Sequence, residues 1–446
     1  MRITFIRPNM YDDRSSDAME PLCFAILKSL TPSHHDVSFF DERLEPIQFD
    51  QATDLVALTV ETYTAHRAYQ IADQFRIRGV PVVMGGYHPT FLPGETLQHA
   101  DAIVAGDAEG VWEQVLCDAE RGALQTIYSS PSFPDLAGYM PDRSIFNGKK
   151  YAPMGLVQYS RGCKFNCSFC SIRAFYGNNL RQRPVAEVVE DIRRSGRRHI
   201  FIVDDNLFVD ADKARDLFEA LVPLKVTWSC QVSIDIARDA ELVRLMARSG
   251  CISALIGFES LDPASLKEIK KGWNVKWQSY DDAIAVFRRA GIMLYGTFVF
   301  GCDNDSVESF GKSVEFATRN KFMLANFNPL TPMPGAPLYD RMQKEGRLLH
   351  DRWWLDPEFS YGDATMLPKN MTARQLTDGC FAARREFNTV NSIMCRLFDR
   401  HSNFRSLYRA GVFLIANLIS RREIYSKQSR PLGARTQTER LAERIA

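Results

Sequence analysis

The stretch Ser160-Arg161-Gly162-Cys163-Lys164-Phe165-Asn166-Cys167-Ser168-Phe169-Cys170 places three thiols within eight positions, on a loop that follows an apolar segment. Three soft ligands this close together favour an iron–sulfur cluster. A four-iron cluster held by three thiolates keeps one iron without a protein ligand, and metal catalysis needs such an open position. A structural zinc site is the alternative, but zinc sites usually pair two C-x2-C or His-x3-His half-sites, and no second half lies nearby. The loop therefore predicts Cys163, Cys167 and Cys170 as cluster ligands.

The C-x3-C-x2-C spacing, with the aromatic Phe169 directly before the last cysteine, resembles the signature of the radical S-adenosylmethionine (SAM) superfamily. The resemblance implies that SAM chelates the open iron through its amino and carboxylate groups. It also implies that reduction cleaves SAM to methionine and a 5′-deoxyadenosyl radical.

Length and composition predict an ordinary globular protein of two or three domains. The chain has 446 residues, 45% of them hydrophobic and 24% charged, with a net charge of +1. This charge gives no electrostatic case for nucleic acid as a partner. The stretch Met1–Asn9 is interrupted by charge and proline, so we expect no export signal and a reducing, cytoplasmic location.

The longest strongly apolar run, Val412–Ile419, is too short to span a bilayer. Arg409, Arg421 and Arg422 flank it, so a helix lying on a membrane surface and a packed terminal helix are both compatible with the sequence. Length favours the packed helix, and membrane association is not expected.

The N-terminal region, residues 1–125, alternates β-rich runs with helical stretches, which predicts a doubly wound, Rossmann-like domain. Residues 126–152 are rich in Pro, Ser, Asp and Gly and predict a linker. The predicted strands are Ile3–Ile6, Val37–Phe40, Leu55–Thr59, Val80–Met84 and Ala102–Val104.

Residues 153–330 alternate more regularly and predict a partial (β/α)6 barrel, whose chemistry gathers at the carboxyl ends of its strands. Residues 331–446, which contain Trp353-Trp354, predict a small helical domain with a disordered tail. The predicted barrel strands are Leu156–Tyr159, Ile200–Val203, Val226–Cys230, Ala254–Phe258, Leu294–Phe300 and Ala325–Phe327.

About three quarters of the chain resembles one subgroup of the radical SAM superfamily, class B, which carries an N-terminal cobalamin-binding-type domain. Its best-known members are the magnesium-protoporphyrin cyclase and phosphonate methylase group. The resemblance rests on Val82–Thr90 and Gly106–Glu109 in the first domain. In the barrel it rests on Val203–Asn206, Gly257–Ser260 and Gly296–Gly301.

That resemblance implies a set of SAM-binding residues. Asp204 or Asp205 is expected to hold the aminoacyl group, and Ser233 and Glu259 to bond the ammonium or the ribose hydroxyls, since a carboxylate accepts from both. Gly162 would let the backbone approach the cluster, and Phe169 would face adenine. Capping of a helix is the competing role for Asp204-Asp205.

Cobalamin binding is left open by the sequence. Cobalamin proteins that ligate cobalt through histidine carry Asp-x-His-x-x-Gly, but the comparable place here reads Asp41–Pro46 and lacks both His and Gly. Members of the subgroup without this histidine still resemble cobalamin binders, with the nucleotide tail along Gly85-Gly86, whereas others keep the domain and use no cobalamin.

Three functions are therefore considered. The first is a cobalamin-dependent C-methyltransferase acting on a natural-product, sugar or lipid substrate. The second is a radical SAM dehydratase of the aminoglycoside diol type, a cyclase, an epimerase or a rearrangement enzyme, with a vestigial cobalamin domain. The third, a non-catalytic iron–sulfur interaction protein, is disfavoured because a structural cluster needs no acids at the strand ends.

Candidates for a proton donor or acceptor near the radical come from the predicted strand ends: Tyr159, Tyr295, Cys302 and Asp303. Each also suits a packing role. The superfamily resemblance implies an electron donor of the flavodoxin or ferredoxin type.

Overall fold

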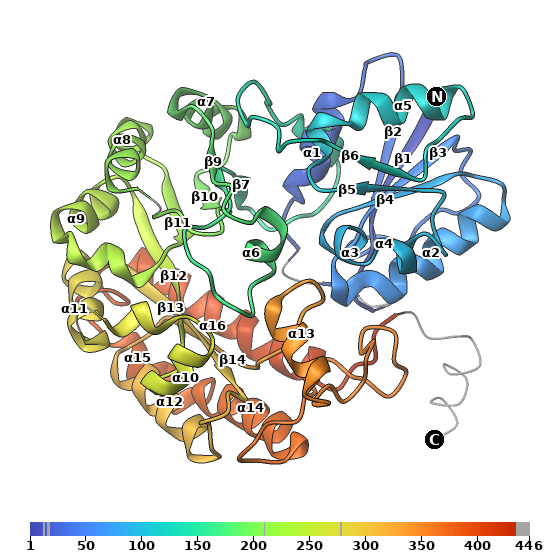
Figure 1. The fold of residues 1–446 in the computed structure, drawn as a ribbon. Coiled ribbons are helices and arrows are strands. Elements are labelled where there is room, and N and C mark those ends of the chain that lie inside the picture. The colour runs from blue at the N-terminus through green and yellow to red at the C-terminus, as the bar shows by residue number, and fades with distance from the viewer. Residues whose placement is uncertain (12–13, 16–17, 209, 277–278, 434–446) are drawn as a thin grey trace. The chain divides into compact units, whose positions relative to one another are not determined.

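The computed structural model describes residues 1–11, 14–15, 18–208, 210–276 and 279–433 (Figure 1). Two compact units make up the chain. The described residues of 1–152, 352–361 and 430–433 form unit 1, and those of 153–351 and 362–429 form unit 2. The last twenty or so residues were predicted to be disordered. Those up to residue 433 have a described structure, in which Gly433 donates its N–H to the Met10 carbonyl, and those from 434 onward lie outside the described residues.

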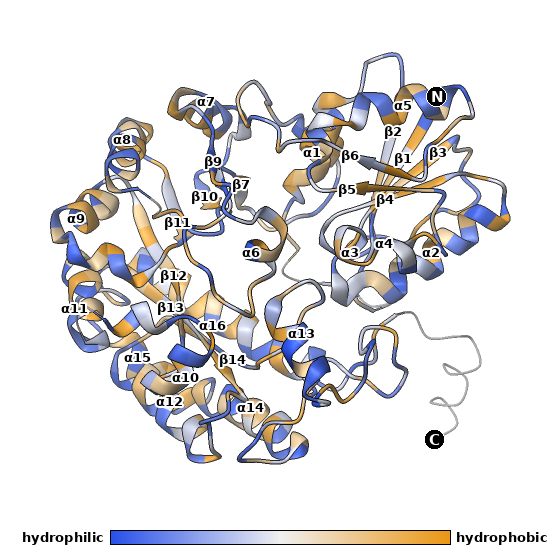
Figure 2. Ribbon diagram, in the orientation of Figure 1, coloured by the Kyte–Doolittle hydropathy of each residue, from blue (hydrophilic) through white to orange (hydrophobic). Residues whose placement is uncertain are grey.

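Unit 1 is built on a parallel six-stranded sheet in the order β2-β1-β3-β4-β5-β6. Short apolar runs such as Leu55–Thr59 form its strands, and both faces are covered, which is why the runs show little alternation (Figure 2). The strand order reverses beside β1, and open sheets bind ligands at such a switch point, outside the carboxyl ends of the strands. The strands are β1 (Arg2–Arg7), β2 (Asp36–Asp41), β3 (Leu55–Thr59), β4 (Val82–Gly85), β5 (Ala102–Ala105) and β6 (Ile127–Ser129).

Helices of unit 1 pack through one apolar stripe each. In α2 the buried residues Ala65, Ala68, Ile71 and Phe75 recur every three or four positions, as one helix face requires. The helices and 3-10 turns (η) are α1 (Leu22–Leu30), η1 (Thr62–Thr64), α2 (Ala65–Ile77), α3 (Tyr87–Phe91), α4 (Pro93–Thr96), η2 (Ala108–Gly110), α5 (Trp112–Glu120) and η3 (Arg143–Phe146).

Unit 2 contains a second parallel six-stranded sheet, in the order β14-β13-β12-β11-β10-β7, and a short antiparallel ribbon of β8 and β9. The strands follow one another in chain order across the sheet, as in a barrel. They are β7 (Gly155–Val157), β8 (Ser160–Arg161), β9 (Arg181–Gln182), β10 (His199–Ile202), β11 (Thr227–Gln231), β12 (Cys251–Glu259), β13 (Met293–Phe300) and β14 (Leu324–Pro329).

Most helices of unit 2 lie outside this sheet and bury one of its faces (Figure 1). Leu338 and Met342 belong to a second apolar cluster, and a third contains Ile393, Leu397, Ala410 and Phe413. The first group is α6 (Ser171–Tyr176), α7 (Val185–Ser195), α8 (Ala211–Leu221), η4 (Val222–Leu224), η5 (Ile234–Arg238), α9 (Ala240–Arg248), α10 (Pro263–Glu268) and η6 (Gly272–Val275). The second group is α11 (Tyr280–Ala290), α12 (Glu308–Arg319), α13 (Pro337–Lys344), α14 (Ala373–Phe387), α15 (Val390–Leu397) and α16 (Leu407–Lys427).

The predicted α/β class with a doubly wound domain and a partial barrel is confirmed. Two regions differ from the sequence prediction. The predicted linker 126–152 belongs to unit 1, where β6 joins the sheet edge and Tyr128 and Phe146 enter the core. The segment from residue 331 is divided, because 352–361 and 430–433 return to unit 1 while α13 to α16 belong to unit 2.

Candidate active site

The three cysteines lie on the loop between β8 and α6, past the carboxyl end of β7. Cys167 is buried, and Cys163 and Cys170 are half-buried. Neighbouring segments hold the loop through its backbone. Ser168 donates its N–H to the Ile269 carbonyl at 3.1 Å and accepts the N–H of Leu338 at 2.9 Å.

Gly162 fixes the start of this loop. Its φ of +94° is a conformation that residues with a side chain rarely adopt, and a Cβ here would overlap the carbonyl oxygen of Asn179. Its N–H donates to Asp205 Oδ2 at 2.9 Å. The backbone beside the first cysteine is therefore held from two sides.

Asp204 is buried and directed at the backbone before the loop. Its carboxylate accepts the N–H of Tyr159 at 2.7 Å and the hydroxyl of Ser160 at 2.5 Å. Burial raises its pKa to about 7, against the opposing effect of these hydrogen bonds. The competing capping role is not seen, since α8 begins later and is capped by Asp210.

Asn206 joins the cysteine loop to the strand ends. Its Oδ1 accepts the N–H of Ser233 at 2.9 Å, and its Nδ2 lies 3.9 Å from the Cys163 sulfur. The Ser233 hydroxyl is buried without a hydrogen-bond partner among the described residues. A buried orphaned hydroxyl costs stability unless a ligand satisfies it, so Ser233 fits the predicted SAM contact.

Glu259 ends β12 at a bulge and forms a buried ion pair with Lys271. Their oxygen and nitrogen lie 2.7 Å apart, and Glu259 adopts a φ of +62°, unusual for a residue with a side chain. Burial lowers the pKa of Lys271, but the Glu259 carboxylate outweighs this and the net shift is upward. Lys271 could not be predicted from the sequence, because no pattern links a residue in an irregular turn to a strand end twelve positions earlier.

The donor set of the loop suits a four-iron cluster. Burial raises the pKa of all three thiols, for Cys167 to about 12. Iron binds thiolates, so cluster assembly releases these protons, and the raised values favour the neutral thiols until iron arrives. Three soft ligands on one loop leave the fourth iron to another molecule.

The sheet face opposite the outer helices is half-buried along its whole width. Strand pairing places Leu255 beside Tyr295, and Ser229 beside Ser253, on this inner face. Short of Glu259, the described strand residues on this face include no Asp, Glu, Lys or Arg, and His199 lies at the amino end of β10. Its other side chains include Leu156, Phe201, Ser229, Leu255, Tyr295, Thr297, Val299, Asn326 and Asn328.

Comparison with known proteins agrees with this geometry. Residues 157–317 match the sequence pattern of the Radical SAM superfamily. Bacteriochlorophyllide d C-12(1)-methyltransferase of Chlorobaculum tepidum is 30% identical over 86% of this chain and 86% of its own length. The chain belongs to the radical SAM superfamily. It is an enzyme of that superfamily, which uses a [4Fe-4S] cluster and SAM, and the predicted subgroup is confirmed as well.

Two further similarities cover both units. Bacteriochlorophyllide d C-8(2)-methyltransferase of the same organism is 31% identical over 77% of this chain and 80% of its own length. The radical SAM methyltransferase TsrM from Kitasatospora setae, solved with cobalamin and a [4Fe-4S] cluster, superposes with a TM-score of 0.62 at 16% identity. That superposition covers 77% of this chain and 75% of TsrM, and it shows the fold alone.

Two candidate catalytic residues of this radical SAM enzyme, Cys302 and Asp303, have surroundings typical of packing and of ion pairing. Cys302 is fully buried in an apolar cluster against which Phe169 packs, and burial raises the pKa of its thiol. Asp303 pairs with three cations, Arg341, Arg347 and Lys369. Burial raises the pKa of Asp303, but the cations outweigh it and the net shift is downward, which suits an ion pair better than a proton donor.

The two tyrosines lie at different depths of the barrel. Tyr159 is 3% exposed beside Asp204, and burial raises its pKa to about 12. Tyr295 lies on the inner face near the amino end of β13, five positions before Phe300. Tyr295 thus lies away from the carboxyl edge that carries the cysteine loop, and its catalytic role stays a prediction.

In unit 1 the glycines of the β4 turn are explained by strand packing. A Cβ on Gly86 would lie 2.8 Å from the Val60 carbonyl oxygen, and one on Gly85 would touch the Val104 side chain at 3.6 Å. Gly106 differs, because it has a φ of +88° and no atom lies within 4 Å of its Cβ position. Open backbone at the carboxyl edge is therefore found at Gly106, and the role predicted for Gly85-Gly86 stays a prediction.

The place of the missing cobalt ligand is filled by ion pairs. Asp41 pairs with Arg43 and accepts the hydroxyl of Tyr151, and Glu42 pairs with Arg67. His88 is fully buried, with its Nε2 2.9 Å from the Tyr69 hydroxyl and 3.1 Å from Glu95. The unit-1 edge therefore fits a cobalamin without a histidine ligand from these positions.

The segment 352–361 borders that same edge. The Trp354 indole donates to Glu95 Oε1 at 2.9 Å, and the Trp353 ring packs on Tyr63, which follows β3. Burial raises the pKa of Glu95, but the hydrogen bonds from His88 and Trp354 outweigh it and the net shift is downward. Gly433 donates its N–H to the Met10 carbonyl after β1.

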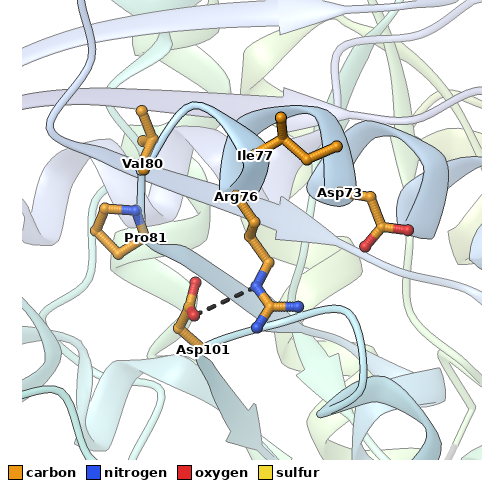
Figure 3. A pocket seen from close by; sticks show the side chains of 7 residues that line it. Asp73, Arg76, Ile77, Val80, Pro81 and Asp101 are labelled. Carbon is orange, nitrogen blue, oxygen red and sulfur yellow. Dashed lines mark hydrogen bonds and ion pairs between the residues drawn. The ribbon is translucent and has the colours of Figure 1, made fainter.

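A pocket of about 650 Å³ lies at the opposite edge of this sheet, by the amino ends of β4 and β5 (Figure 3). Arg76 and Asp101 form an ion pair across it, with Nε and Oδ1 3.3 Å apart. This pocket lies at the amino ends of the strands, so it is separate from the carboxyl edge where open sheets bind ligands.

Proposed function

We propose that this radical SAM enzyme methylates an unactivated carbon of a small molecule, with cobalamin as its second cofactor. The main support is the similarity to two methyltransferases. The similarity extends over 86% and 77% of this chain, which is more than either unit contains. One chain thus carries both a cobalamin-type unit and a barrel with a cluster loop, and this chemistry needs both groups.

The cluster and SAM, once reduced, supply the 5′-deoxyadenosyl radical that removes a hydrogen atom. The residues of the chain prepare that event. Gly162 and Asp205 fix the cysteine loop, and the Ser233 hydroxyl and the Glu259 carboxylate are available to the ammonium or the ribose of SAM. Lys271 holds Glu259 in place, with its Nζ 2.7 Å from Glu259 Oε1, and hydrogen bonds to a carboxylate are stronger than those to a neutral acceptor.

Cobalamin, when bound, supplies the methyl group. The chain would hold it at the carboxyl edge of unit 1, where Gly106 leaves the backbone open. The absence of histidine in Asp41–Pro46 favours a cobalamin whose lower face receives no imidazole from that loop.

The inner face of the barrel supports a substrate that is uncharged where it meets the radical. Apart from His199 at the amino end of β10, its side chains are apolar groups, amides and hydroxyls, and burial of a charged group against them would leave that charge unpaired. A neutral, largely apolar carbon framework therefore suits this surface better than a phosphorylated one.

Anaerobic reconstitution followed by SAM turnover tests the proposal. We expect about one cobalamin beside one four-iron cluster, and both 5′-deoxyadenosine and S-adenosylhomocysteine as products. With methyl-labelled SAM, the label should enter the product of any accepted substrate. The Cys167→Ser variant is expected to lose the cluster and all 5′-deoxyadenosine formation.

A different result would favour the second function considered above. A cluster that cleaves SAM without bound cobalamin, and without S-adenosylhomocysteine, would indicate dehydration, cyclisation, epimerisation or rearrangement. The electron donor of flavodoxin or ferredoxin type and the cytoplasmic location remain predictions, which pull-down under reducing conditions and cell fractionation would test.

A further inference from the structure

Helix α16 packs through one face and exposes apolar side chains on the other. Ala410, Phe413 and Asn417 are buried in unit 2, and Asn417 donates to the Met323 carbonyl at 3.0 Å. On the opposite face Ile415 and Leu418 are 62% and 64% exposed. A surface helix ordinarily turns polar residues outward, and α16 does not. The sequence was compatible with a packed helix and with a helix lying on a membrane surface, and each description fits one face of α16.

The exposed apolar side chains continue from α16 onto α15 and the loop between them. We define this as the α15–α16 surface. Its members are Val390, Met394, Phe398, Phe404, Leu407, Tyr408, Leu414, Ile415, Leu418, Ile419 and Tyr425. Single exposed apolar residues are normal, but eleven of them on two helices that contact each other, and on the loop between them, indicate an interaction site.

The same region is strongly basic. Residues 384–427 contain nine Arg or Lys and three Asp or Glu, in a chain whose net charge is only +1. Two of the nine, Arg384 and Arg396, are buried, and the other seven are exposed or half-buried. Two of the three acids are already paired, Asp399 with Arg288 and Glu423 with Lys427. Arg422 is exposed, and neither it nor Arg421 forms an ion pair within the described part of the chain.

We propose that the α15–α16 surface binds an anionic membrane surface. Apolar residues that enter the headgroup boundary, with arginines beside them, are the composition of interfacial helices. Tyr408 and Tyr425, near the two ends of α16, have the amphipathic rings that favour that boundary. No helix in the described residues is long and apolar enough to cross a bilayer, so the contact is with the surface.

Two details sharpen the proposal. Arg409 is not available to lipid, because its guanidinium donates to the Gly291 carbonyl and is half-buried. A second copy of the chain is a poorer occupant, since two such basic faces would repel each other across a symmetric interface.

Co-sedimentation of the reconstituted full chain with vesicles tests this. The vesicles are phosphatidylcholine alone, or phosphatidylcholine with about one quarter phosphatidylglycerol, at about 0.1 M salt. We expect binding to the anionic vesicles only. The Ile415→Glu/Leu418→Glu variant should reduce the partition coefficient by about tenfold or more, and Arg421→Gln/Arg422→Gln should reduce it and weaken its salt dependence.

Ile77→Glu is the matched control, because Ile77 is 79% exposed and apolar but lies in unit 1. It should bind vesicles as the parent chain does. Cluster content and SAM cleavage, measured for all variants, show that each is folded. The proposal is overturned if anionic vesicles sediment no protein. It is equally overturned if light scattering finds a dimer that the Ile415→Glu/Leu418→Glu variant dissociates.

Discussion

Gly162 shows how one missing side chain positions a metal ligand. Replacement by alanine adds a Cβ that overlaps the Asn179 carbonyl and a left-handed backbone cost of about 1–2 kcal/mol. We expect Gly162→Ala to lose most of its cluster, measured as iron and sulfide per chain after anaerobic reconstitution.

Gly196→Ala is the comparison for that variant. Gly196 also has a positive φ, +61°, but no atom lies within 4 Å of its Cβ position. It should lose about 1 kcal/mol of stability and keep its cluster. Equal iron content in both variants would show that the contact with Asn179 does not matter.

Asp204 makes stability depend on pH. Burial raises its pKa from 3.8 to about 7, so the folded chain holds this proton more tightly than the unfolded chain. Its contribution to stability is complete below about pH 4 and declines as the pH rises to about 7. Asp204→Asn, which keeps the acceptor, should remove this decline, and urea unfolding across that range would measure it. Parallel curves for both chains would contradict the assignment.

Residues whose side-chain chemistry defines the site could be predicted from the sequence. Residues that belong to the site only through contacts in the folded chain could not. Three cysteines in a fixed spacing can be recognised because iron requires them together. Asn206 belongs to the predicted motif Val203–Asn206. Its hydrogen bond from the Ser233 N–H could not be predicted, because it requires the ends of two strands to lie side by side. The strand that carries Tyr295 was predicted as Leu294–Phe300 and is found as Met293–Phe300, so Tyr295 lies near its amino end in both.

The end of β12 shows what a strand contributes to a site. A bulge between Gly257 and Glu259 turns the chain, and a Cβ on Gly257 would overlap the Glu259 carboxylate and lie 2.6 Å from Lys271 Nζ. Gly257→Ala should therefore displace the ion pair and weaken SAM binding by about tenfold or more, while the cluster is retained. Equilibrium dialysis of SAM against the reconstituted protein measures this.

Gly272→Ala provides the control for the strand end. Its nearest neighbour atom would lie 3.8 Å away, an ordinary contact, so SAM affinity should stay unchanged. Unchanged affinity in Gly257→Ala as well would remove Glu259 from the SAM site.

Strands and helices with a regular hydrophobic pattern could be predicted from the sequence. Short strands that are recognisable only by their pairing with a neighbouring strand could not. The strands of both sheets follow apolar runs, and the parallel order follows from the helices between them. β6 has only three residues and no periodicity, so its pairing with β5 could not be read from a stretch rich in Pro and Ser.

At the scale of the whole molecule, the chain passes between its two units four times. Trp354, some 200 residues beyond the first crossing, completes the buried network of Tyr69, His88 and Glu95. Trp354→Phe removes the donor to Glu95 and should destabilise unit 1 by about 1–3 kcal/mol. Hydrogen exchange of α2 to α4 would detect the loss, while exchange in unit 2 should be unchanged.

Fold class and catalytic unit followed from alternation and the cysteine loop, because each is a local pattern repeated along the chain. The return of 352–361 to unit 1 left no local sign. The pair Trp353-Trp354 predicts burial, but the sequence does not indicate which of the two units buries it. The contact of Trp353 with Tyr63 is known only from the folded structure.

The crossing chain also sets an order of events during synthesis. The first 152 residues leave the ribosome well before residues 430–433, which at about 5–20 residues per second follow roughly 15 to 55 seconds later. Until then unit 1 lacks Trp354 against Glu95 and Gly433 against Met10. The carboxyl edge of nascent unit 1 therefore stays incomplete until residues 352–361 and 430–433 have been translated.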